Sequence, residues 1–596
     1  MKDNQSLLMA TEDKNKTPKP AKANNKIDEK LGALWKDKRS YSKRLTYAGA
    51  VMLALLYPFL FFGPLETVAF ASASLSFQYS DIFWPLLGIM LATWLITSPL
   101  VALLRGKVYN LVMTLAFSLA LCFYLQGLLL NGSLGTLTGD GVNWPAFGED
   151  MLANLLLWLV VFVAVSFVLY LHRRTWRQMV VWASAALVAV QLVPTVAIAA
   201  GAYRSGAYAD ITGYSLTEKG LYDLSEKKNA FVFVLDRLDY DYVQAVLDED
   251  PHFFDSLSGF TQYTNAISSS ARTKPALSQI LTPGADLAYS VDTKEYFDTI
   301  WQKDGTDLLQ DLSGAGYRIG LYTSLQNLFS NAQDLQGVAN AGNGQGQLLW
   351  DQLLPKLYNL SAYRYLPLAM KPFYWAATST YNEGVHAADD APVYAMDDVK
   401  VLGGFDNAAV TLKDESSFKF IHLMGPHAPY TLNADGTRSQ EPTSAVTQTK
   451  GCFALLFEVF SQMKALGIYD DATIIITADH GSAVNDTKPL LKATRIGLFY
   501  KPAGATGALK LSSAPVSTAN VAATLIASAG LDKPAYGLPL EQVTAENTPV
   551  RYYYKSISDP GGNNETAVCR YRVVGDAADF ANWILEAELP VVGKFY

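Results

Sequence analysis

Acidic and imidazole side chains directly follow strongly hydrophobic runs in this chain of 596 residues. Residues 473–481 read T-I-I-I-T-A-D-H-G, so Asp479 and His480 come after a run of β-branched residues. Such a run is typical of a strand buried on both faces, and open α/β sheets bind ligands at the carboxyl ends of such strands. Because carboxylate and imidazole both bind divalent metals, the stretch predicts a metal site, with Gly481 allowing a sharp turn beside it. A plain strand-to-loop turn is the alternative.

A second carboxylate stands in the same kind of position. Residues 230–236 read A-F-V-F-V-L-D and predict another doubly buried strand, which ends at Asp236. The residues that follow indicate a short helix with acids in its first turn. Asp236 is therefore either a metal ligand or the N-cap of that helix, a place that Asp239 or Asp241 fills equally well.

A threonine stands between two cations at a predicted helix start. Residues 268–275 read S-S-S-A-R-T-K-P, and Pro275 suits the first turn of a helix. Thr273 is then near a helix N-terminus, where the backbone N–H groups and the dipole favour an alkoxide or a bound phosphate. The alternative is an ordinary Thr N-cap. Arg272 and Lys274 are candidate phosphate ligands, or solvated side chains.

Two histidines occupy one rigid loop. Residues 418–430 read F-K-F-I-H-L-M-G-P-H-A-P-Y, so His422 and His427 follow a short strand in a Gly/Pro-rich loop. Histidines at such a place favour a functional role over a structural one. His386, in the Gly- and Tyr-rich stretch 340–400, receives no role.

The elements around these residues alternate between strand and helix. Amphipathic spacing predicts a helix over Gly451–Gly467, and an Ala-rich pattern predicts another over Val516–Gly530. Further strands are predicted over Thr261–Asn265, Asp311–Ser324 and Lys492–Lys501. Such alternation indicates an α/β domain.

The first third of the chain has a different composition. Hydrophobic residues make up 50% of the whole chain, and they concentrate in five runs free of Lys, Arg, Asp and Glu. The runs are Thr46–Phe62, Ile82–Leu104, Val108–Leu130, Met151–Leu171 and Gln178–Gly201. Because most of them reach the roughly 20 residues that cross a bilayer, they predict transmembrane helices.

Basic residues in the short loops predict the orientation. They follow the second and fourth runs, at Arg105, Lys107, Arg173, Arg174 and Arg177. The other two loops, 66–81 and 132–150, contain no Lys or Arg. By the positive-inside rule the N-terminus is cytoplasmic, and everything after about residue 202 lies on the extracytoplasmic side of the cell membrane.

These patterns divide the chain. We expect a disordered tail at 1–45, the membrane helices at 46–202, a linker at 203–228, a catalytic domain at 229–545 and a small-sheet extension at 546–596. The net charge of -8 and the lack of a basic, aromatic-interleaved patch indicate no nucleic-acid partner. Cys122 falls in the third run, and whether the extracytoplasmic Cys452 and Cys569 pair stays open.

Taken in order, these motifs resemble the alkaline phosphatase/sulfatase superfamily. The sequence has Asp236 after a strand, Thr273 before a helix, the H-x-x-x-x-H-x-P-Y loop, and then Asp479–Gly481. Five apolar runs ahead of such a domain are similar to the lipoteichoic acid synthase and phosphoethanolamine transferase branch. The resemblance covers nearly all of residues 46–540. It implies a five-helix membrane domain followed by an α/β domain with a mixed, mostly parallel central sheet.

The resemblance also implies roles. The ligands of one divalent metal, Mn²⁺ or Zn²⁺, would be Asp236, Thr273, Asp479 and His480. Thr273 would also be the nucleophile that forms a phospho-threonine intermediate, since metal coordination activates a hydroxyl. His427, and less directly His422, would contact the phosphoryl group or protonate the leaving alkoxide.

Two features depart from the resemblance. The extra Asp-x-x-x-His pair of two-metal relatives has no convincing equivalent in this chain, so we expect one catalytic metal. The stretch Gly316–Ser330 lacks the His that lipoteichoic acid synthases carry there, which weakens the case for a glycerol-phosphate acceptor pocket.

Three functions fit these observations. The first is a membrane phosphotransferase that moves a phosphoglycerol or phosphoethanolamine head group from a phospholipid to an envelope glycan or glycolipid. The second is an anchored hydrolase of phosphate or sulfate esters. A true sulfatase is disfavoured, because its formylglycine arises from Cys or Ser and Thr273 would oxidise to a ketone. The third is a non-catalytic envelope scaffold, which the complete set of site residues argues against.

Overall fold

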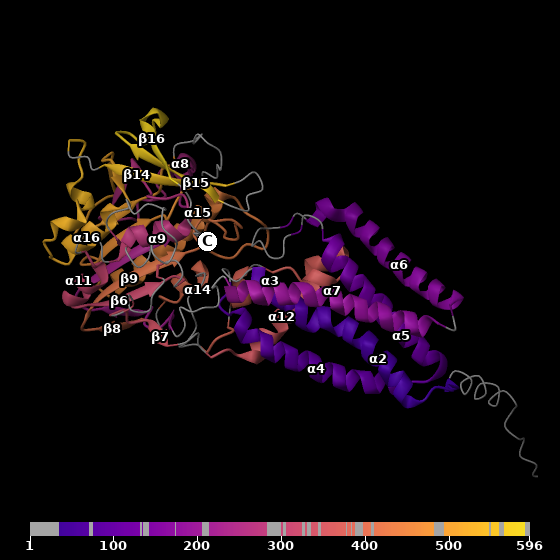
Figure 1. Ribbon diagram of the computed structural model, residues 1–596. Coiled ribbons are helices and arrows are strands. Elements are labelled where there is room, and N and C mark those ends of the chain that lie inside the picture. The colour runs from indigo at the N-terminus through magenta and orange to yellow at the C-terminus, as the bar shows by residue number, and fades with distance from the viewer. Residues whose placement is uncertain are drawn as a thin grey trace, which may run out of the picture.

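The protein has two regions, a helix bundle and an α/β domain, which lie end to end (Figure 1). The computed structural model describes residues 35–70, 75–131, 134, 142, 144–172, 175–204, 214–282, 300–301, 306–324, 328–329, 335, 337–343, 347–376, 378–382, 384–387, 397–406, 410–481, 494–546, 550–558 and 565–589. Most of the tail predicted at 1–45, part of the linker predicted at 203–228, and Arg173 and Arg174 lie outside these residues.

Five helices of the bundle are long and apolar enough to cross a membrane, as the five runs predict. They are Tyr41–Ala69, Tyr79–Leu103, Gly106–Leu130, Trp144–Leu171 and Trp176–Ala200. The first combines α2 (Tyr41–Leu56), the π-helical η1 (Tyr57–Phe62) and α3 (Gly63–Phe70). The others are α4 (Tyr79–Leu103), α5 (Gly106–Leu125) with η3 (Gln126–Leu130), η4 (Trp144–Phe147) with α6 (Gly148–Leu171), and α7 (Trp176–Arg204). Each begins a few residues before its apolar run, because the flanking polar residues continue the helix.

A seven-stranded sheet forms the centre of the α/β domain, in the order β12-β4-β11-β10-β3-β9-β6. The strands are β3 (Asn229–Leu235), β4 (Thr261–Tyr263), β6 (Tyr317–Tyr322), β9 (Ser416–Leu423), β10 (Thr473–Thr477), β11 (Phe499–Lys501) and β12 (Lys510–Ser512). The neighbours β10, β3, β9 and β6 run parallel, whereas β11 is antiparallel to both of its neighbours. The predicted mixed, mostly parallel sheet is therefore confirmed.

Helices cover this sheet in two packed groups. One group is α8 (Tyr240–Glu249), α14 (Asp398–Gly403) and α15 (Ala445–Ala465). The other is α9 (Thr273–Leu281), α11 (Leu308–Gly314) and α16 (Asn520–Ser528). Every residue of β3 and β10 is buried, which explains why their sequences are uniformly apolar or β-branched.

Smaller sheets surround this core. They pair β1 (Tyr214–Leu216) with β7 (Ala341–Asn343), β2 (Asp223–Ser225) with β8 (Thr411–Lys413), and β5 (Ala266–Ile267) with β13 (Val516–Ser517). An antiparallel sheet near the C-terminus contains β14 (Arg551–Ser558), β15 (Glu565–Val573) and β16 (Trp583–Leu589). The described cysteines are buried and form no disulfide, so Cys452 and Cys569 do not pair.

Several predicted elements are shorter in the structure than in the sequence pattern. The strand predicted over Thr261–Asn265 ends at Tyr263, and of Asp311–Ser324 only Tyr317–Tyr322 is a strand, because helix α11 extends to Gly314. The helix predicted over Val516–Gly530 begins only at Asn520, because Val516 and Ser517 form β13 against β5. Of the strand predicted over Lys492–Lys501, only its last three residues form β11, and residues 492–493 lie outside the described part.

The stretch 340–400 supplies helices that pack on the bundle rather than on the sheet. They are α12 (Trp350–Tyr365), the 3-10 helix η8 (Leu368–Phe373) and α13 (Thr378–Asn382). Figure 1 shows α12 among the bundle helices, and its buried apolar residues share one core with those of η1, α3 and α4. The ring of Tyr365 fills the space over Gly63 and Gly127, where an added Cβ would come within 2.6 and 2.5 Å of it.

Polar contacts fix the same junction. Arg364 donates from Nε and Nη2 to the two carboxylate oxygens of Glu66 in α3, each at 3.2 Å. His386 lies with Nε2 3.0 Å from the carbonyl oxygen of Ser76. The bundle and the α/β domain are thus joined by side chains from both regions, in addition to the chain connection at 205–213.

Candidate active site

Asp236 and Asp479 stand side by side at the carboxyl edge of the central sheet. Because β3 and β10 are parallel neighbours with Val234 opposite Thr477, the residues that follow them meet at one place. Asp236 is 9% exposed and Asp479 is fully buried. Asp239, and not Asp236, caps helix α8, accepting from the backbone N–H of Asp241 at 2.8 Å. The cap alternative for Asp236 is therefore wrong, and its carboxylate is available to the site.

One carboxylate oxygen of Asp479 accepts hydrogen bonds from backbone groups, whereas the other has no hydrogen-bond partner among the described residues. Oδ1 accepts from the N–H of Arg237 at 3.1 Å and from the N–H of His480 at 2.7 Å. Arg237 has a backbone φ of 61°, which is unfavourable for any residue other than glycine. This strained turn directs the Arg237 N–H at Asp479 and leaves Oδ2 facing Asp236 and His480.

The imidazole of His480 presents an unprotonated nitrogen to the two acids. Its Nδ1–H donates to the carbonyl oxygen of Gly481 at 2.9 Å, which leaves the lone pair on Nε2. Nε2 lies 3.3 Å from Oδ2 of Asp479 and 3.9 Å from Oδ1 of Asp236. Gly481 is required for close packing rather than for a positive φ, since a Cβ there would come within 2.6 Å of Thr494 and 2.8 Å of Asp239.

Thr273 is the first residue of α9, as its sequence predicts. The residue before it, Arg272, is the N-cap and makes no side-chain capping bond, so the ordinary Thr-cap alternative is wrong. The Thr273 hydroxyl oxygen lies 3.4 Å from Nε2 of His480. It is therefore at a helix N-terminus and beside His480, where the helix dipole favours negative charge.

The segment that leads to Thr273 is paired with the C-terminal sheet. The Ala271 N–H donates to the carbonyl oxygen of Tyr554 at 3.0 Å, and the Tyr554 N–H donates to that of Ser269 at 2.9 Å. Arg272 donates from Nε to Ser556 Oγ at 3.1 Å. Strand β14 therefore holds the backbone in front of the hydroxyl and orients one of the two flanking cations. Burial lowers the pKa of the other, Lys274.

His422 lies beside the acids from the neighbouring strand β9. Its Nε2 is buried without a described hydrogen-bond partner, 3.7 Å from Oδ2 of Asp236, and its Nδ1 lies 3.3 Å from Thr323 Oγ1. Burial alone would lower the pKa of His422, but the nearby carboxylates, first that of Asp236, raise it above its ordinary value. His422 is thus within reach of a ligand bound at the two acids.

His427 lies in the loop after β9. Its Nδ1–H donates to the carbonyl oxygen of Ala428 at 2.6 Å. Burial alone would raise the pKa of Asp236, but the surrounding imidazoles, His427 among them, hold that pKa below its usual range. His427 therefore lies within electrostatic reach of Asp236.

A buried acid that the sequence analysis missed supports this loop. Asp398, the first residue of α14, accepts from the N–H of Met424 at 2.7 Å and from that of Gly425 at 2.9 Å. Burial raises the pKa of Asp398 to about 7, against the effect of these two bonds. Gly425 has a φ of 56° and lies so close to β3 that a Cβ would be 2.7 Å from the Asp236 nitrogen. In the sequence Asp398 is far from its partners Met424 and Gly425, so no local pattern marks it.

These residues fit one divalent metal ion. One ligand atom each from Asp236, Asp479 and His480 lies within 4.8 Å of the other two, and Thr273 Oγ1 adjoins them. Among the described residues, Asp236 Oδ1 and Asp479 Oδ2 are buried oxygens without a hydrogen-bond partner. Leaving such atoms unpaired is costly, and two carboxylates with an imidazole are the ligands of Zn²⁺ and Mn²⁺ sites. A metal ion bound by these residues would provide the partner that the two buried oxygens lack.

The α/β domain is similar to a known family and to several solved structures. The family model described as Sulfatase matches residues 228–531. The phosphonate monoester hydrolase of Silicibacter pomeroyi is 15% identical over 59% of this chain and 88% of its own, with a TM-score of 0.38. A protein in the alkaline phosphatase superfamily from Vibrio parahaemolyticus is 12% identical over 63% of this chain and 84% of its own, with a TM-score of 0.32. No curated protein matches the chain.

The sheet and the donor set define an enzyme of the alkaline phosphatase/sulfatase superfamily, a hydrolase or a transferase whose relatives use divalent metals. Within that superfamily the chain belongs to the sulfatase family, because the family model covers more than half of it.

Proposed function

We propose that this protein is a membrane-anchored, metal-dependent phosphotransferase. It would take a phosphoglycerol or phosphoethanolamine head group from a phospholipid and pass it to an envelope glycan or glycolipid. The observation that carries the proposal is the position of the Thr273 hydroxyl, at the start of α9 and 3.4 Å from His480 within the two-carboxylate cluster. A bound Mn²⁺ or Zn²⁺ would lower the pKa of that hydroxyl and offset charge on the phosphoryl oxygens.

The chain's own residues account for the first half of the reaction. The Thr273 hydroxyl releases its proton to solvent water and its oxygen forms a bond to phosphorus, while the bond from phosphorus to the diacylglycerol oxygen breaks. His427, in its protonated form, would donate the proton that this leaving alkoxide needs. The dipole at the start of α9 would stabilise negative charge on the phosphoryl oxygens.

The second half repeats the chemistry in reverse. The oxygen of an acceptor hydroxyl forms a bond to phosphorus and its proton passes to the now neutral His427, while the Thr273 oxygen leaves and takes a proton from solvent water. Water in place of the acceptor would make the same enzyme a phosphodiesterase, which is the alternative function. A sulfatase that depends on formylglycine is disfavoured, because oxidation of Thr273 gives a ketone rather than an aldehyde.

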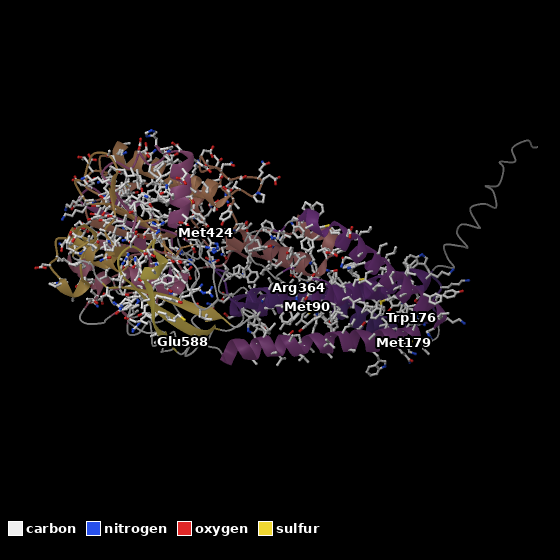
Figure 2. All side chains as sticks on the ribbon, turned by 90° about the horizontal axis from the view of Figure 1, so that it is seen from above. Met90, Trp176, Met179, Arg364, Met424 and Glu588 are labelled. Carbon is white, nitrogen blue, oxygen red and sulfur yellow. The ribbon has the colours of Figure 1, made fainter. Side chains whose placement is uncertain are left out.

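The placement of the site favours a lipid donor. Met424, one residue past β9 and three before His427, lies on the side of the α/β domain that faces the bundle (Figure 2). Helix α14, which carries Asp398, lies on the same side (Figure 1). An anchored site that faces the bilayer raises the effective concentration of lipid head groups.

Head-group release tests the proposal. The purified chain in vesicles is incubated with phosphatidylglycerol or phosphatidylethanolamine that carries a labelled acyl chain, in the presence of Mn²⁺ or Zn²⁺. Labelled diacylglycerol that appears only when a sugar acceptor is added indicates a transferase. Release without an acceptor indicates the hydrolase, and no release from either lipid contradicts the proposed donor.

A further inference from the structure

The segment that follows α12 is almost wholly apolar. Residues 366–376 read L-P-L-A-M-K-P-F-Y-W-A and include all of η8. Lys371 is their only charged residue. Within a domain that is otherwise built like a soluble enzyme, such a stretch needs a buried or lipid environment for its side chains.

The charge of Lys371 is turned away from the surface. Its Nζ donates to the carbonyl oxygens of Tyr363 and, at 3.3 Å, of Arg364, which are in the last turn of α12. The side chain is 1% exposed, and the ammonium group lies 5.0 Å from the centre of the Tyr363 ring. Lys371 thus caps α12, and its charge is absent from the outer face of η8.

The outer face of η8 consists of exposed apolar side chains. Phe373 is 80% exposed and Met370 is 39% exposed. The neighbouring Tyr374 and Trp375 are half-buried aromatic residues, which are enriched where a membrane protein meets the head-group region. Leaving an apolar side chain as large as Phe373 in water is unfavourable.

The level of η8 follows from its contact with α6. The Leu368 N–H donates to Asn154 Oδ1 at 2.9 Å, and Asn154 is the one buried residue among the described side chains of α6. Asn154 is six residues after the start of α6 at Gly148, which corresponds to about 9 Å along a helix of about 36 Å. With a hydrocarbon core about 30 Å thick centred on α6, the boundary on the side of the α/β domain falls about 3 Å from Gly148, so the contact of Asn154 with Leu368 lies about 6 Å inside it.

At this level the face of η8 continues the exposed surface of α6. Leu152 is 61% exposed and Leu156 is 52% exposed, on either side of Asn154. Of the most apolar window of this helix, only 6% is buried inside the protein. The exposed faces of η8 and α6 are therefore expected to contact the same environment.

We propose that Met370 and Phe373 insert into the membrane leaflet nearest the α/β domain, with lipid acyl chains and glycerol groups as their partners. The α/β domain then enters the bilayer itself through η8, besides being tied to the bundle by Arg364 and Tyr365. A second copy of the chain is disfavoured, because the exposed face of η8 adjoins the exposed apolar residues of α6, such as Leu152 and Leu156. The proposal requires that the bundle crosses a bilayer, and it holds for a transferase and a hydrolase alike.

Spin labels on engineered cysteines test this inference in the full chain reconstituted in lipid nanodiscs. Because Cys122, Cys452 and Cys569 are buried, a label introduced with Phe373→Cys reports on one exposed position. The label's collision rates are measured with oxygen, which concentrates in lipid, and with a water-soluble nickel chelate. Leu156→Cys is the lipid control, and Leu511→Cys, at a position 71% exposed on β12, is the water control.

We expect the Phe373 label to resemble the Leu156 label, with oxygen collisions exceeding nickel collisions, and the Leu511 label to show the reverse. A Phe373 label that collides mainly with the nickel chelate would overturn the proposal, because the face would then lie in water. A Phe373 label shielded from both reagents would also overturn it, since another protein surface would then cover η8. A Leu156 label in water would remove the bilayer on which the proposal depends and would overturn it too.

Discussion

The hydroxyl oxygen of Thr273 lies 3.4 Å from Nε2 of His480, although the two residues are 207 positions apart in the chain. The contact arises because α9 begins beside the carboxyl edge of the central sheet, where β10 ends. Since the Nδ1–H of His480 is engaged by Gly481, its Nε2 is free to bind a metal that the Thr273 oxygen also reaches.

Metal removal should abolish activity. We expect chelation of the purified enzyme to eliminate turnover and Mn²⁺ or Zn²⁺ to restore it. Asp479→Asn should lose the metal, measured as equivalents per chain by mass spectrometry, and lower kcat/KM more than the roughly 10- to 100-fold typical of an outer-shell residue. His252→Ala, at an exposed residue whose imidazole pairs with Asp255, is the control and should keep both. Full activity of the chelated enzyme would contradict the site.

Because Tyr365 packs against the bundle, the effect of a Gly→Ala substitution on stability should depend on whether the glycine contacts this ring. Gly127→Ala would place a Cβ 2.5 Å from the Tyr365 ring, so we expect a loss of about 1–3 kcal/mol in the free energy of unfolding. Gly88→Ala, whose Cβ would meet nothing within 4 Å, should be neutral. Thermal unfolding in detergent measures both, and adding Tyr365→Leu to Gly127→Ala should recover part of the loss. Equal effects at the two glycines would rule out this packing.

The pair Glu66–Arg364 predicts strong coupling between bundle and α/β domain. The two side chains are only 12% and 18% exposed, so Arg364→Met should leave an uncompensated buried carboxylate and cost about 3–5 kcal/mol. The double variant Glu66→Leu with Arg364→Met should cost less than Arg364→Met alone, because no charge is left unpaired. A double-mutant cycle on the unfolding midpoint measures the coupling, and additive losses would contradict it.

The raised pKa of Asp398 predicts a pH dependence of stability. With a pKa of about 7 in the folded protein and about 3.9 when unfolded, Asp398 keeps its proton in the folded state over that interval. Stability should therefore fall as the pH rises from about 4 to about 7, by up to about 4 kcal/mol, and then level off. Asp398→Asn should flatten this slope in unfolding midpoints measured across that range. Parallel profiles for the two proteins would exclude Asp398 as the cause.

Much of this architecture can be predicted from the sequence. The five apolar runs and the uniformly apolar β3 and β10 predict their elements because burial on all sides leaves little choice of residue. The positions of Asp236, Asp479 and His480 follow from one rule, that parallel strands present their carboxyl ends at one edge. The structure brings Thr273 to that edge as well.

Other parts depend on long-range contacts that leave no local pattern. Helix α12 has no apolar run long enough to suggest a membrane neighbour, and its place on the bundle depends on small residues such as Gly63 and Gly127, far away in the sequence. The backbone hydrogen bond from Tyr554 to Ser269 joins segments 285 positions apart. The sequence of the C-terminal sheet therefore does not indicate that the sheet supports the segment before Thr273. The spacing of residues in the sequence does not indicate which metal, which head group or which acceptor the protein binds.

The central claim is that Thr273 carries the transferred group, and trapping the intermediate tests it most directly. Wild-type enzyme and the Thr273→Ala variant are incubated with metal and with phospholipid labelled in the head group, quenched in acid and analysed by peptide mass spectrometry. Our account predicts a labelled phosphodiester on Thr273 in the wild-type enzyme, dependent on metal, and no label or turnover in a folded Thr273→Ala variant. Undiminished turnover in Thr273→Ala, or the label on another residue, would contradict it.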